Sequence, residues 1–64
     1  MSESVNTAID MVKVELEMTA IFLRALAKHL VANEMDGQAG NCTLRADACT
    51  RALTALDFVS NKIR

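Results

Sequence analysis

Apolar residues in the first half of the chain recur at alternating intervals of four and three. The positions are Val5, Ile9, Val12, Leu16, Leu23, Leu26 and Leu30, with Thr19 and Asn33 at the two remaining places of the pattern. This spacing puts every member on one face of an α-helix. Because no proline or glycine interrupts the pattern, it predicts a helix from about residue 4 to about residue 35.

A second apolar pattern follows a polar, glycine-containing break. We predict a loop at about residues 36–41, where Gly37 suits the left-handed conformation that ends many helices. Asn41 or Thr43 can cap a second helix over about residues 42–62. Its predicted inward residues are Ala46, Cys49, Ala52, Leu53, Leu56, Val59 and Ile63, flanked by Ala48 and Ala55. A loop this short joins antiparallel neighbours, so residues 1–64 are predicted to form one all-α domain, a two-helix antiparallel hairpin.

The first helix carries a second apolar stripe, which a hairpin cannot bury. This stripe consists of Met11, Val14, Met18, Ile21, Phe22, Ala25 and Ala32, beyond a charged stripe of Asp10, Lys13, Glu17, Arg24 and Lys28. One shorter partner helix covers only one face, and soluble monomers rarely expose apolar patches of this size. We therefore expect a homodimer that forms a four-helix bundle. A helical protein partner and a monomer with a methionine-rich surface are the alternatives.

The predicted interface combines this stripe with two further residues. It consists of Met11, Val14, Met18, Ile21, Phe22, Ala25, His29 and Phe58. His29 lies beside Phe22 on the stripe, whereas Phe58 lies on the outer face of the second helix. Packing against a second subunit and anchoring a different partner are both open for Phe58.

Composition and charge argue against several classes of function. The chain is 52% hydrophobic, has no proline and carries a formal net charge of −1, so it has neither the basic footprint of a nucleic-acid binder nor the basic face of a membrane-surface helix. The longest uncharged run of the first helix, residues 18–23, is far shorter than the roughly 20 residues that span a bilayer. The first residues also lack the basic start of a signal peptide. We expect a soluble, cytoplasmic protein.

The residues that carry chemistry do not form a recognisable site. Cys42 and Cys49 lie about 10.5 Å apart along a helix, beyond the about 7 Å that a disulfide spans. We interpret them as small buried side chains, with a cross-link between subunits as the alternative. His29 is the single histidine, and the sequence lacks the paired ligands of a zinc site and a phosphate-binding loop. We predict no cofactor, no metal and no catalytic residue, and therefore no enzyme.

Two short stretches resemble known helical hairpins. The stretch 51–59 (RALTALDFV) is similar to the small-and-aliphatic second helix of the co-chaperones of type III secretion needle subunits. This resemblance implies a chaperone subunit of a hetero-oligomer. The stretch 7–13 (TAIDMVK) resembles the first helix of the plasmid copy-number RNA-binding hairpin, which implies an RNA-binding dimer built as a four-helix bundle.

The outer face of the first helix bears on the choice between these functions. The RNA-binding family reads RNA with polar and basic residues there, whereas this chain has Met11, Val14, Met18 and Ile21. We therefore do not expect a nucleic-acid partner. The leading hypothesis is a non-enzymatic protein-interaction module, a regulatory or adaptor protein that acts as a homodimer. The chaperone subunit and an RNA- or DNA-binding dimer are the alternatives.

Overall fold

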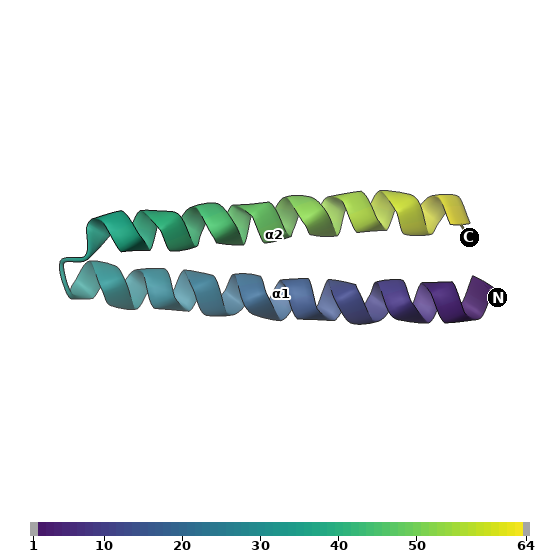
Figure 1. Cartoon of the computed structure of the whole chain (residues 1–64), viewed down its shortest axis with the longest axis horizontal. Coiled ribbons are helices and arrows are strands. Elements are labelled where there is room, and N and C mark those ends of the chain that lie inside the picture. Colours follow the sequence, from purple (N-terminus) through teal and green to yellow (C-terminus); the bar gives the residue numbers. More distant parts are fainter. Residues whose placement is uncertain (1, 64) are drawn as a thin grey trace.

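Two antiparallel helices lie side by side along their whole length in a computed structural model of the chain (Figure 1). The structure describes residues 2–63, and the side chains from residue 4 onward; residues 1 and 64, the ends of the predicted domain, lie outside the described part. Helix α1 spans Ser2–Ala32 and helix α2 spans Asp36–Ile63. The hairpin extends over 49 × 15 × 10 Å. For the described residues, this confirms the predicted all-helical hairpin.

The three-residue turn at 33–35 ends α1 with a pair of backbone hydrogen bonds. The N–H of Met35 donates to the carbonyl of Leu30 at 2.9 Å, and the N–H of Glu34 donates to the carbonyl of Val31 at 3.0 Å. This pair is the Schellman arrangement, in which the residue after the last helical turn takes a left-handed conformation. Glu34 is that residue, with a φ of 61°. The left-handed position of this turn is therefore occupied by a glutamate and not by a glycine.

The predicted loop at residues 36–41 is wrong, because α2 begins at Asp36. Gly37 and Gly40 are helical, and no described glycine has a positive φ. The carbonyl of Met35 accepts a hydrogen bond from the N–H of Ala39 at 3.0 Å, which starts α2 earlier than the glycines suggested. Asp36 places a negative charge in the first turn, where the helix dipole favours it. As a result, α2 is nearly as long as α1 rather than much shorter.

The two helices meet along a seam in which small residues are interspersed with leucines and other larger residues. The seam residues on α1 are Asn6, Ile9, Lys13, Leu16, Ala20, Leu23, Ala27 and Leu30, and those on α2 are Ala39, Cys42, Ala46, Cys49, Leu53, Leu56 and Ser60. Among them Ala20, Ala27, Ala39, Ala46 and Ser60 are buried, and the others are half-buried. Small residues at a helix contact allow the two axes to approach closely. Among the described residues, no large side chain is fully buried.

The observed seam keeps only part of the predicted one. Ile9, Leu16, Leu23 and Leu30 belong to it as expected, but Val5, Val12 and Leu26 are 45%, 45% and 46% exposed. Their places at the seam are taken by the next residues along the chain, Asn6, Lys13 and Ala27. On α2 the same shift leaves Val59 45% exposed and buries Ser60. Ile63, predicted to point inward, is 41% exposed at the end of α2.

Small side chains explain this shift at Ala27 and Ser60, but not at Lys13, which is larger than Val12. Ala20 and Ala27 on α1, and Ala39 and Ala46 on α2, each recur at an interval of seven residues and are all buried. Two rows of alanines let the helices approach more closely than rows that contain valine and leucine. The hairpin thus closes on its alanine rows. The larger side chains next to these rows remain nearly half exposed to solvent.

Candidate interaction surface

The predicted interface residues of α1 lie on the face turned away from α2. We call Met11, Val14, Met18, Ile21, Phe22 and Ala25 the outer stripe. The five large side chains of this stripe are 51–66% exposed, and Ala25 and the neighbouring His29 are exposed as well. The second helix covers none of them well. The outer stripe is therefore accessible apolar surface in the single hairpin.

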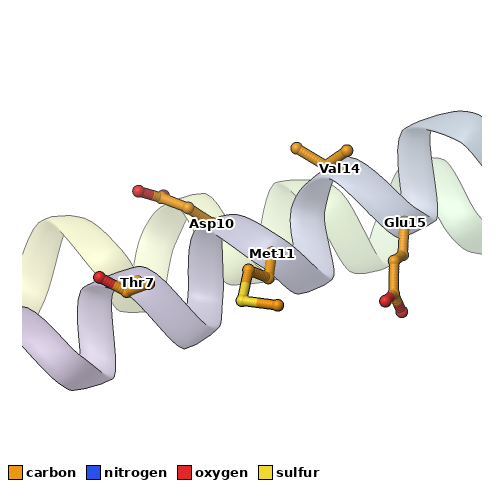
Figure 2. Close-up of a pocket in the computed structure, with 5 residues that line it drawn as sticks. All are labelled: Thr7, Asp10, Met11, Val14 and Glu15. Atoms are coloured by element: carbon orange, nitrogen blue, oxygen red, sulfur yellow. The ribbon is translucent and has the colours of Figure 1, made fainter.

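Figure 2 shows the start of this stripe, with α2 behind α1. A shallow, open depression is lined by Thr7, Asp10, Met11, Val14 and Glu15. Met11 and Val14 supply its apolar surface, and two carboxylates stand at its rim. All five residues come from successive turns of one helix, so they do not enclose a substrate. The depression is a strip of helix surface suited to contact with another side chain or helix.

A second apolar surface lies along one long edge of the hairpin. We call it the apolar side; it consists of Val5, Val12 and Leu26 on α1, and Ala48, Ala52, Ala55 and Val59 on α2. Each of these residues immediately precedes a seam residue; Phe22 of the outer stripe also does, so the two surfaces adjoin at Phe22. In an antiparallel pair, the residues that precede the two rows of the seam lie on the same side of it. The apolar side therefore combines both helices, whereas the outer stripe belongs to α1 alone.

The opposite edge is polar and holds the ion pairs between the helices. We call it the charged side; it consists of Asp10, Glu17, Arg24, Asp47, Thr50 and Asp57, each immediately after a seam residue. The guanidinium of Arg24 lies 3.3 Å from the Asp47 carboxylate and donates to the Thr50 hydroxyl at 3.2 Å. The seam residue Lys13 pairs with Asp57. The hairpin thus satisfies this side with its own side chains.

Phe58 is separated from the other predicted interface residues. It lies on α2 with 63% of its surface exposed, and the ammonium of Lys62 lies 4.9 Å from the centre of its ring. This distance is within the range of a cation–π contact. Leu44, which is 66% exposed, lies on the same face of α2 two heptads earlier. The structure therefore does not bring Phe58 together with the outer stripe.

The cysteine, histidine and acidic residues that could carry chemistry do not form a common site in the described part of the chain. Cys42 and Cys49 are free thiols with half-buried side chains in the seam. Across residues 2–63, no three histidine, cysteine or acidic side chains gather where they could hold a metal ion. Neither described helix combines the length and hydrophobicity required to cross a bilayer.

The interpretation of this chain rests on these surfaces, because comparison with other proteins does not add to it. No protein family matches the chain, and the searches of curated proteins and of solved structures found no significant match.

Sequence reasoning missed the apolar side because it assigned Val5, Val12 and Leu26 to the hairpin core. The signal that could have found it is the regular spacing of alanines. Ala20 and Ala27 come one residue after Thr19 and Leu26 and repeat at the same interval of seven. If these two alanines form the row that contacts α2, the larger residues Thr19 and Leu26 lie outside the seam.

Proposed function

We propose that this chain is a non-enzymatic protein-interaction module that acts as a homodimer, in which two hairpins form a four-helix bundle. The observation that carries the proposal is the distribution of large apolar side chains. Among residues 2–63, fourteen large hydrophobic side chains are exposed and none is fully buried. Soluble monomers rarely leave contiguous apolar surface of this extent in water. A second chain supplies the cover that the hairpin lacks.

The energies are consistent with association. Covering a half-exposed side chain of this size contributes about 1–2 kcal/mol, a discounted share of the value for full burial. Association itself costs roughly 4–15 kcal/mol in lost freedom of the two partners. The outer stripe or the apolar side alone gives a gain comparable to this cost. An interface that also draws on the half-buried leucines of the seam exceeds it.

A second candidate is a subunit of a hetero-oligomeric chaperone, favoured by the character of the outer stripe. This stripe is confined to α1, and it contains Met11, Met18 and Phe22 in exposed positions. Methionine side chains adapt to differently shaped partners. In this role the stripe binds a helical segment of another protein, and the isolated chain aggregates unless that protein is co-expressed.

Sedimentation equilibrium of the full chain, combined with circular dichroism, tests the homodimer. We expect twice the chain mass at micromolar concentrations, with a melting temperature that rises with protein concentration, because dimerisation stabilises the folded state by mass action. A well-folded monomer throughout the micromolar range contradicts the proposal. An aggregating chain that becomes soluble only with a co-expressed protein favours the chaperone subunit instead.

A further inference from the structure

We infer that the second copy of this chain docks on the apolar side of the hairpin and not on the outer stripe. This inference rests on the proposed homodimer and specifies which of two exposed surfaces holds it together. The two surfaces differ in the number of helices that build them. The outer stripe is built by α1 alone, whereas the apolar side presents α1 and α2 side by side. A four-helix bundle requires both helices of each hairpin to face the bundle axis.

The apolar side is continuous with the core that the hairpin already has. Leu16, Leu23 and Leu30 are half-buried in the seam, and they belong to the row that lies nearest the apolar side. Val12 and Leu26, each a little under half exposed, flank this row. A copy placed here completes the burial of the seam leucines together with the flanking residues. A copy on the outer stripe leaves all of these as they are.

The residue types on the apolar side suit contact with an identical surface. A two-fold dimer needs one patch that is complementary to itself. Here α1 supplies branched side chains at Val5, Val12 and Leu26, and α2 supplies alanines at 48, 52 and 55. Alanine rows accept larger side chains from a facing helix and allow close approach. Each copy therefore carries both the projecting and the receiving surface.

The charges and the size of the apolar side also favour a second copy of this chain as its partner. The ion pairs of Arg24 and Lys13 lie on the charged side, so a copy on the apolar side breaks none of them. Where charges interrupt the apolar side, Glu15 on α1 and Arg45 on α2 have opposite signs. The Cα atoms of the hairpin extend over 49 × 15 Å in the plane that contains both helices, a rectangle of roughly 700 Å², which leaves room for the about 800 Å² that each partner buries in an interface of standard size.

Two matched double variants on α1 test this assignment. Val12→Glu with Leu26→Lys changes the apolar side, and Met18→Glu with Ile21→Lys changes the outer stripe. Each introduces one acid and one base in place of two exposed apolar side chains, so the net charge stays the same. We expect the first variant to raise the dimer dissociation constant by at least about 100-fold, since charges in a buried interface lose their hydration. We expect the second to stay within about threefold of the wild type, because side chains outside an interface are near neutral.

Ala48→Glu keeps the test valid if the first variant fails to fold. Ala48 lies on the apolar side of α2 and is exposed in the hairpin. Glutamate there has Arg45 and Arg51 three residues away on either side, which favours the helix. We expect a folded monomer by sedimentation and circular dichroism.

The outcomes separate the inference from the proposal on which it rests. A dimer that survives both Val12→Glu with Leu26→Lys and Ala48→Glu overturns the inference and leaves the homodimer standing. Dissociation by Met18→Glu with Ile21→Lys, with the apolar-side variants still dimeric, overturns it in favour of the outer stripe. A wild-type monomer refutes the homodimer itself.

Discussion

The two long edges of the hairpin flank the same seam but are completed in different ways. On the charged side, Arg24 and Lys13 of α1 reach Asp47 and Asp57 of α2, so the two helices supply each other's polar partners. On the apolar side, residues such as Val12 and Leu26 remain a little under half exposed. The hairpin thus supplies polar partners for one edge from its own side chains and leaves the other edge partly exposed. The other edge is available to a second molecule.

The exposed ion pair on the charged side adds little to the stability of the hairpin. The side chains of Arg24 and Asp47 are 47% and 48% exposed. Ion pairs exposed to this degree contribute about 0–1 kcal/mol. The burial of residues in the seam must therefore supply most of the stability of the hairpin. Substitutions at the seam, at the turn and at the ion pairs test this difference between the edges.

The largest effect is expected at the seam. Ala46 has no exposed surface, and Ala46→Leu forces extra volume between two closely packed helices. We expect a loss of about 2–3 kcal/mol in the free energy of unfolding, the upper part of the range for overpacked cores. Urea denaturation measures it. The control is Ala32→Leu, an exposed position at the end of α1, for which we expect a change of less than about 0.5 kcal/mol. Equal effects at the two positions contradict a tight alanine seam.

A smaller effect of opposite sign is expected at the turn, which fixes the side of α1 that α2 covers. Glu34 has a left-handed φ of 61°, a conformation that a side chain disfavours and glycine adopts freely. We expect Glu34→Gly to raise the free energy of unfolding by about 0.5–1 kcal/mol, after subtraction of the greater freedom of glycine in the unfolded chain. Thermal denaturation at fixed protein concentration measures this gain. Glu34→Ala keeps a β-carbon and should give no gain. If alanine stabilises as much as glycine, the left-handed turn is not the cause.

The smallest effect is expected on the charged side. A double-mutant cycle with Arg24→Ala and Asp47→Ala isolates the interaction between the two side chains. We expect a coupling of about 0.2–1 kcal/mol that decreases with added salt, because both groups are exposed. Denaturation at low and high salt measures it. A coupling above about 2 kcal/mol would show that the charged side holds the hairpin together, and the contrast between the edges would fail.

Local patterns in the sequence predict the helices better than the surface through which they meet. The spacing of Ile9, Leu16, Leu23 and Leu30 correctly identified one row of the seam, since these residues face the partner helix in both the predicted and the observed arrangement. It could not identify the second row. Leu26 and Ala27 are both apolar candidates for that row, and the choice between them depends on how closely α2 approaches.

The position of the turn also depends on energies that composition does not reveal. Gly37 and Gly40 predicted a break, but an exposed glycine inside a helix costs only about 0.5–1 kcal/mol. The hydrogen bonds that close α1 at Glu34 and Met35, and the start of α2 at Asp36, together outweigh that cost. Exposure of the outer stripe follows from the sequence, whereas the assignment of a partner to it does not.

The three-residue turn also leads us to expect a particular order in which the hairpin closes. The entropy lost in closing a loop grows with its length, so contacts between the helices form at lowest cost beside the turn. We expect the seam around Leu30 and Ala39 to form first and the seam around Ile9 and Leu56 to form last. Fluctuations that open the hairpin run in the reverse direction. The half of the apolar side farthest from the turn, with Val12 and Val59, is thus the part whose backbone amides should exchange with solvent soonest.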